Sequence, residues 1–468
     1  MSKLSVLDLA FLALETAANP KHVAGLAVFK PGRSGPRSRP RELLQQMKQV
    51  PAAPPFNQKL DTSLLSMPRW VEDPDTDLDW HVRHLALPQA SDGHDLMLLV
   101  SQLHATTLDR SRPLWECYLI EGLEDGNFAI YIKVHHAYMD GMSMARRLTG
   151  TLNSSAKDLR LMPFWGLKLQ RPKVRPHETD LLQQLLGRLR SAGTIAKSIP
   201  MMGGLAVSPW LKALGGKKHA IPIPFTAPRT RLNEPLTPAR STALASLSLA
   251  RMKRVAKATG TTVNDVLLSL SDGALLAYLD HFGEKPQEPL IAQMPISVRR
   301  KDADSGGNQI TVAQVELSFG SRDPVERLKQ ISQRTANVKN QYGRLSEFAA
   351  TNYTVLVQSL AQLADVTGLN RRLPPLGNVV VSNVLGPKEA LYLDGAKLVG
   401  MYPISTMPPG VSLNITFFTT AGTVYAGIVA GREAISDSAF LAEQMENGLN
   451  QLTRRLRQKA RKSSRARN

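Results

Sequence analysis

The residues best suited to catalysis stand together at 135–141, which read His-His-Ala-Tyr-Met-Asp-Gly. They follow an apolar segment at 128–134 whose composition is typical of a buried strand. An imidazole has an ordinary pKa of about 6.5, so at pH 7 it is largely neutral and can accept a proton from a hydroxyl group. The pattern therefore predicts a histidine general base where the apolar strand ends.

The two histidines are expected to have different roles. Side chains alternate faces along a strand, so His135 and His136 should point in opposite directions if the strand continues through them. His136 would then share a face with Ile132 and Val134, and it is our candidate for the general base. We expect His135 either to orient His136 or to be structural.

Asp140 and Gly141 suit the entry to a helix that begins near 141. Asp140 can cap this helix or hold an arginine and so support the loop, and Gly141 would permit a tight turn. A histidine pair can also bind a metal, but no third clustered ligand accompanies this one, so no metal site is predicted. The single cysteine, Cys117, excludes a disulfide framework, and we interpret it as a packed apolar residue.

Strands and helices are expected on both sides of this motif. The sequence predicts strands at 115–120 and 128–134, joined by a turn at 124–127. A helix is predicted at 262–281, where apolar residues recur at helical spacing after Thr262, a plausible N-cap. Further strands are predicted at 289–297, 312–319, 377–384, 411–418 and 423–430, and a last helix at 434–458.

Membrane spans and secretion signals are not predicted. The uncharged stretch 398–431 is long enough to cross a bilayer. However, Pro and Gly residues interrupt it, and its apolar residues alternate with polar ones. Alternation is the period of a strand, so we expect a buried hairpin there rather than a transmembrane helix.

The charge is concentrated in two segments. The chain has 468 residues and a formal net charge of +19. Residues 151–220 hold twelve basic and three acidic residues, and 453–468 hold eight basic and no acidic ones. The rest of the chain is nearly neutral, and the tail has no aromatic residues for stacking on bases, so no nucleic-acid partner is expected.

These features predict two folded domains with a linker and a tail. The expected segments are an N-terminal domain at 1–150 with the histidine motif, a basic linker at 151–235 with an amphipathic helix at 181–190, a C-terminal domain at 236–452, and a basic disordered tail at 453–468.

Several motifs together resemble one known family. His-His-x-x-x-Asp-Gly after an apolar strand resembles the signature of chloramphenicol-acetyltransferase-like acyltransferases and of peptide-synthetase condensation domains. The companion motifs look like those of bacterial wax ester synthase/diacylglycerol acyltransferases. They are Pro113-Leu114-Trp115, Asn264-Asp265-Val266-Leu267-Leu268, Ser382-Asn383-Val384-Leu385-Gly386-Pro387, and an opening with Asp8, Phe11, Leu12, Glu15, Pro20 and His22-Val23-Ala24-Gly25.

The resemblance implies a fold and a reaction. The fold would be α/β, with two chloramphenicol-acetyltransferase-like domains, mixed sheets and an active-site tunnel at their interface. The reaction would move a long-chain acyl group from acyl-CoA, a co-substrate rather than a bound cofactor, to a fatty alcohol or diacylglycerol. His136 would take the hydroxyl proton as the oxygen attacks the thioester.

Other site residues are expected from the same motifs. Asn264, at a helix N-terminus, is the candidate stabiliser of the oxyanion, although it can instead support the helix cap. Glu15, Gly141, Ser382 and Asn383 are candidate substrate-binding residues, and Ser382 and Asn383 can equally serve only the turn that follows them.

Two alternative functions are compatible with the same residues. The chain can be a condensation-type domain that uses carrier-bound substrates, or a lipid-binding protein without catalysis. We expect a cytoplasmic protein. Because the product of the implied reaction is apolar, the linker helix and the basic tail can make peripheral contact with the inner membrane or lipid inclusions. Equally, the helix can pack on its own protein while the tail is solvated.

Overall fold

The fold is that of a computed structural model, which describes most of the chain. The described residues are 2–4, 6–32, 40–62, 68–91, 93–168, 224–297, 310–343 and 347–465. The helix predicted at 181–190 lies outside them.

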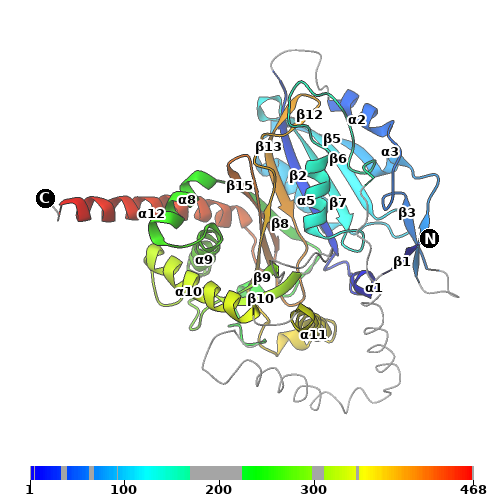
Figure 1. Ribbon diagram of the computed structural model, residues 1–468. Helices are drawn as coiled ribbons and strands as arrows, with labels where there is room; N and C mark the ends of the chain where they lie inside the picture. Colours follow the sequence, from blue (N-terminus) through cyan, green and yellow to red (C-terminus); the bar gives the residue numbers. More distant parts are fainter. Residues whose placement is uncertain are drawn as a thin grey trace, which may run out of the picture.

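Two six-stranded sheets form the core of the molecule (Figure 1). The first sheet has the order β12-β13-β2-β7-β6-β5. Its strands are β12 (Tyr392–Leu393), β13 (Ala396–Ile404), β2 (His22–Lys30), β7 (Phe128–His135), β6 (Trp115–Leu123) and β5 (Val82–Ser91). The strands predicted at 115–120 and 128–134 are confirmed as β6 and β7, and the short 3-10 turn η1 (Glu124–Gly126) joins them.

The second sheet has the order β10-β9-β11-β14-β15-β8. Its strands are β10 (Ile310–Glu316), β9 (Ile291–Ser297), β11 (Val379–Leu385), β14 (Leu413–Thr420), β15 (Thr423–Gly431) and β8 (Arg240–Ser248). All five strands predicted for this part of the chain are confirmed, to within a few residues. A small third sheet combines β1 (Ser2–Lys3), β4 (Arg69–Glu72) and β3 (Gln58–Asp61).

The uncharged stretch forms strands, as predicted. β14 and β15 pair as an antiparallel hairpin, with Leu413 opposite Ala430 and Thr420 opposite Thr423. None of the helices in the described ranges is long and apolar enough to cross a membrane. Both large sheets mix parallel and antiparallel pairs, which confirms the predicted α/β class with mixed sheets.

Helices cover the sheets in layers. The helices and 3-10 turns of the first half are α1 (Val6–Ala13), α2 (Pro40–Lys48), α3 (Leu78–His81), α4 (Gly93–Ala105) and α5 (Gly141–Gly150). Those of the second half are η2 (Arg231–Asn233), α8 (Leu249–Thr259), α9 (Val263–His281), α10 (Pro324–Tyr342), α11 (Glu347–Val366), η3 (Leu369–Arg371) and α12 (Ser438–Arg465). In Figure 1, α8, α9, α10 and α12 lie together on one side of the second sheet, and a large apolar core fills the space between these layers.

The helix predicted at 262–281 is confirmed as α9, and its start has a clear local cause. The Thr262 hydroxyl accepts the Asp265 N–H, and the Asp265 carboxylate accepts the Thr262 N–H. This capping box satisfies two backbone donors that a helix start otherwise leaves unpaired.

Two parts of the chain differ from the predicted segmentation. β12 and β13 lie within the predicted C-terminal domain, but β13 pairs with β2 of the first sheet, from Lys397 opposite Lys30 to Ile404 opposite Ala24. The tail predicted to be disordered continues α12 as helix to Arg465. Its Arg, Lys, Gln and Ala residues are good helix formers, and they extend a helix already anchored by buried Leu449 and Leu452.

Candidate active site

The histidine motif lies where β7 leaves the first sheet. β7 ends at His135, which pairs with His22 of β2. The chain then turns, because the Tyr138 N–H bonds to the His135 carbonyl and the His136 N–H bonds to the Lys21 carbonyl at 2.8 Å. The strand therefore stops one residue before His136, and the alternation expected for a continuous strand does not set the direction of this side chain.

His136 is half-buried, and its ring is covered on one face. The Phe11 ring of α1 stacks on it at 4.1 Å between centroids, with the planes 20° apart. Burial lowers the pKa of His136 to about 4, although the charge of nearby Asp140 acts in the opposite direction. At neutral pH the imidazole is therefore uncharged and has a lone pair available for a proton.

His135 is fully buried, and one of its ring nitrogens is held by a hydrogen bond. Its Nδ1 accepts the Ala137 N–H at 3.1 Å, which leaves the ring proton on Nε2. Nε2 faces the Oε1 atom of Glu15 at 3.6 Å. These contacts tie His135 to the turn that carries His136, so its nitrogens are not open to a substrate.

Glu15 is a buried carboxylate at the centre of these contacts, with a side chain only 4% exposed. Its Oε1 accepts the Lys21 N–H at 3.0 Å, and its Oε2 accepts the Arg110 guanidinium at 3.1 Å. Burial alone would raise the pKa of Glu15, but the contact with His135, together with the Lys21 and Arg110 bonds, lowers it to about 2. Glu15 is therefore ionised, and it faces the histidine turn.

Lys21 and Arg110 were not identified from the sequence. Lys21 is buried, and its Nζ donates to the Met407 carbonyl at 3.4 Å, which connects the start of β2 to the segment before β14. Burial lowers the pKa of Lys21 to about 8, against the opposing charges of Asp365 and Glu15. For Lys21, the one signal in the sequence was the position of a lysine directly before a largely apolar strand.

Asp140 and Gly141 begin α5, as the sequence predicts. Asp140 is the N-cap, and its Oδ1 accepts the Ser143 N–H at 2.7 Å. Gly141 does not have a positive φ, so the chain enters α5 here without a left-handed residue. A Cβ at Gly141 would meet no atom within 4 Å, so open space adjoins the backbone here.

The structure does not bring Asn264 to His136. α12 runs along β8, because Ser438 bonds to Ser241 at the start of β8 and Asn450 bonds to Arg251 just after its end. α9 runs against α12, because Phe440 contacts Tyr278 and His281 near the end of α9. The start of α9, with Asn264, therefore lies at the carboxyl end of β8.

The histidine motif lies at the opposite end of that strand. Arg240, the first residue of β8, donates to the Ala18 carbonyl, three residues before Lys21. These contacts therefore place Asn264 and the histidine motif toward opposite ends of β8. A helix N-terminus is a local feature of the sequence, whereas its distance from another site depends on the path of the whole chain.

Ser382 and Asn383 lie inside β11 and not in the turn that follows. They pair in register with Thr416 and Phe417 of β14. Asn383 Oδ1 is buried without a hydrogen-bond partner. After β11, the backbone at Gly386 packs closely on the Phe418 ring, which a Cβ at this position would overlap. Neither Ser382 nor Asn383 has a hydrogen bond to the histidine turn among the described residues.

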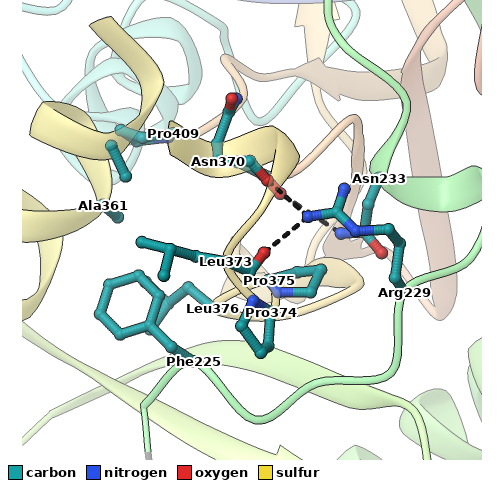
Figure 2. A pocket seen from close by; sticks show the side chains of 12 residues that line it. Phe225, Arg229, Asn233, Ala361, Asn370, Leu373, Pro374, Pro375, Leu376 and Pro409 are labelled. Carbon is teal, nitrogen blue, oxygen red and sulfur yellow. Dashed lines mark hydrogen bonds between the residues drawn. The ribbon is translucent and has the colours of Figure 1, made fainter. Parts of the chain in front are cut away.

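A small pocket lies between the end of α11, the segment that follows it and Pro409-Gly410 (Figure 2). Figure 2 shows Leu373 and Phe225 on one side of it and Arg229 on the other, where the guanidinium donates to the carbonyls of Asn370 and Leu373. Pro409 and Gly410 also line the pocket, and they follow Met407, whose carbonyl binds Lys21. The tunnel expected between the domains remains a prediction.

Metal and thiol chemistry find little support in the described part of the chain. There, no three His, Cys, Asp or Glu side chains gather as they would around a metal ion. Cys117 is buried in the first sheet, and burial raises the pKa of its thiol well above its usual range, so it packs as an apolar residue.

Comparisons with known proteins agree with this architecture. Residues 4–267 match the wax ester synthase/diacylglycerol acyltransferase catalytic domain, and residues 306–453 match the C-terminal domain of the same family. The chain is 35% identical over 449 residues to a probable diacylglycerol O-acyltransferase of Mycobacterium tuberculosis, covering 95% of this chain and 97% of the relative. It is 36% identical over 454 residues to a second, putative one from that organism, covering 96% and 99%.

Solved structures give the same result. The wax ester synthase/diacylglycerol acyltransferase from Marinobacter aquaeolei VT8 matches with a TM-score of 0.76 and 31% identity, covering 97% of this chain and 100% of that one. The first condensation domain of the CDA synthetase matches with a TM-score of 0.53 and 16% identity, covering 97% and 95%. The second likeness shows a shared fold alone.

Proposed function

Because this chain belongs to the wax ester synthase/diacylglycerol acyltransferase family and is an acyltransferase, we propose that it uses acyl-CoA as donor. The proposed acceptor is the hydroxyl group of a fatty alcohol or of diacylglycerol, and the product is a wax ester or a triacylglycerol. The observation that carries the proposal is the half-buried, uncharged imidazole of His136 beside the buried pair of His135 and Glu15.

The first step is removal of the hydroxyl proton. His136 takes this proton as the oxygen attacks the thioester carbonyl, and a tetrahedral oxyanion forms. The ring must face the hydroxyl group in one fixed direction for this transfer. The bonds from the Ala137 N–H to His135 and from the His136 N–H to Lys21 hold the backbone on both sides of the ring.

The oxyanion needs donors close to His136. α5 begins within five residues of His136, and its first N–H groups, those of Gly141 and Met142, have no carbonyl partner within the helix. A helix start also carries partial positive charge, which favours a developing oxyanion. We assign the oxyanion to these two N–H groups and no longer to Asn264.

The second step expels coenzyme A. The tetrahedral intermediate collapses, the carbon–sulfur bond breaks, and the His136 imidazolium gives its proton to the departing sulfur. The imidazole is then neutral again, and no covalent acyl-enzyme is formed. A low pKa for His136 favours this return of the proton, because the imidazolium is a strong acid in its buried surroundings.

A donor and acceptor screen tests the function. Purified protein is incubated with palmitoyl-CoA and either hexadecanol, a diacylglycerol or no acceptor, while the free thiol of coenzyme A is measured. We expect acceptor-dependent thiol release with the wild type. A parallel reaction offers the acyl group on a carrier protein, and turnover with that donor alone would replace the proposal with condensation-type chemistry.

A further inference from the structure

Large apolar side chains gather on the outer face of α11 and the turn that follows it. Among the described residues they are between 41% and 68% exposed. They are Leu360, Leu363, Val366, Leu369 and Leu373, and we call them the α11 patch. Soluble proteins expose single apolar residues routinely, but a cluster within fourteen successive positions marks an interaction surface.

The α11 patch is separate from the contacts that hold α11 in the fold. The inner face of α11 is also apolar, with Val357, Ala361 and Ala364 buried against the protein. Leu360, Leu363 and Val366 follow one another at intervals of three residues, so they share the opposite side of the helix. The outer side of α11 thus carries apolar side chains that the described part of the protein leaves uncovered.

Positive charge accompanies the patch. Arg371 and Arg372 are exposed at its end, between Leu369 and Leu373. An apolar surface bordered by arginines is complementary to a bilayer whose headgroups are anionic, because the leucines can enter the acyl boundary while the guanidinium groups stay among phosphates. This charge complementarity favours a lipid surface over an apolar face of another protein.

The position of the patch relates it to the histidine motif. Leu373 belongs both to the patch and to the lining of the pocket in Figure 2. Pro409 and Gly410 also line that pocket, and they closely follow Met407, whose carbonyl accepts a bond from Lys21. Lys21 in turn holds the backbone of His136. Bonds through Met407 and Lys21 thus link the segment that lines the pocket to the backbone of the proposed base.

We propose that the α11 patch docks onto the surface of an anionic lipid bilayer, with the pocket side of α11 facing the substrates dissolved there. The inference deepens the proposed function and rests on it, because apolar donors and acceptors concentrate in such a surface. It assigns the contact to α11 and η3, which is a different place from the linker helix and the basic tail expected from the sequence.

Vesicle flotation tests the apolar contribution. Full-length protein is mixed with vesicles of phosphatidylcholine, with or without phosphatidylglycerol, and the floating fraction is measured. We expect binding to the anionic vesicles, and a loss of about tenfold in affinity for the double variant Leu363→Ser, Val366→Ser. The matched control is Leu385→Ser, which removes a leucine that is 79% exposed outside the patch and should leave binding unchanged.

A charge variant tests the second contribution. The double variant Arg371→Glu, Arg372→Glu should weaken binding to anionic vesicles about fivefold or more per residue, and salt should weaken the wild type likewise. Lys253→Glu, Arg254→Glu on α8 is the matched control, because these two residues are also adjacent, basic and exposed. Equal losses in both double variants would show general charge attraction and would overturn the assignment to α11.

Two further readouts separate this inference from others. Turnover of a short-chain, water-soluble acyl-CoA and alcohol should be unchanged in the patch variants, whereas failure of the proposed function would abolish it in every form of the protein. Sedimentation then tests a second copy of the chain as the occupant. A wild-type dimer that becomes a monomer in Leu363→Ser, Val366→Ser, without vesicle binding by the wild type, would overturn the proposal.

Discussion

At the scale of single residues, the site combines a neutral imidazole with a charged carboxylate that does not touch it directly. Glu15 contacts His135, and His135 contacts the backbone at Ala137, so the charge acts on the geometry of the turn. This arrangement separates two tasks. In the proposed mechanism, His136 keeps a lone pair for the substrate, while Glu15 and His135 act as positioning residues that keep the ring in place.

Replacing the base is the most direct test at this scale. His136→Ala should lower kcat by about 10²–10⁴-fold, which is the usual contribution of general base catalysis. The melting temperature should change little, because the ring is half-buried and its main contact is Phe11. His94→Ala, at an exposed position on α4, is the control and should retain full turnover. Near-complete activity in His136→Ala would refute the assignment.

The Glu15 carboxylate predicts a dependence of stability on pH. Its pKa is lowered from 4.5 to about 2, so ionised Glu15 stabilises the fold above pH 4.5, and this contribution disappears as pH falls through 2. Glu15→Gln should therefore lower the free energy of unfolding at pH 7 by an amount on the order of 2 kcal/mol. Denaturant titrations should show the two proteins converging toward pH 2.

Activity gives a second readout for Glu15. We expect Glu15→Gln to lower kcat by about tenfold with KM little changed, because the turn loses its anchor but the substrate contacts persist. A tenfold rise in KM with kcat unchanged would instead place Glu15 in contact with substrate, which is the role that the sequence resemblance implies.

At the scale of elements, the starts of helices set the geometry of the site. α5 begins at the histidine turn, and its N-cap Asp140 both ends that turn and starts the helix. α10 begins with an equivalent cap, Asp323, far from the histidines in the chain, and it accepts the Val325 N–H at 2.8 Å. Comparing variants of Asp140 and Asp323 therefore separates the effect of losing an N-cap on stability from an effect on turnover.

Asp140→Ala should cost about 1 kcal/mol of stability, the usual effect of removing an N-cap, and should also reduce turnover. Asp323→Ala should show a similar loss of stability in thermal unfolding but normal turnover. If Asp140→Ala folds stably and works at the normal rate, the histidine turn does not depend on its cap, and Asp140 does not support the site.

At the scale of the whole molecule, the two sheets are joined by strand exchange. β13 leaves the second half of the chain to pair with β2, and it crosses β15 on the way. At the crossing, Gly427 lies directly against the Pro403 carbonyl, and a Cβ there would overlap that oxygen. Next to Pro403, Tyr402 of β13 and Ser246 of β8 form a 2.9 Å hydrogen bond between the two sheets.

Gly427→Ala should therefore force the sheets apart and destabilise the protein by about 3 kcal/mol, as overpacking in a core does. Gly93→Ala is the control, because a Cβ there meets no atom within 4 Å and its φ is not positive. Thermal unfolding of both variants measures the difference. Equal melting temperatures would mean that the crossing can relax without cost.

The sequence by itself determined what depends on neighbouring residues. The capping box of Thr262 and Asp265, the alternation in β14 and the motif after β7 act within a few positions, so their patterns could be read directly. The enzyme family followed from the same local motifs. The α/β class followed from the periods of the strands and helices.

The tertiary structure alone decided which distant residues meet. Glu15 bonds to Arg110 across 95 positions of the chain, β13 joins a sheet formed by the first half, and Asn264 lies at the far end of β8 from His136. Such contacts are chosen by the total burial and hydrogen bonding of the whole chain, in which each residue contributes a small share. No short pattern of residues records that sum, and for this reason the supports of the site emerged only from the fold.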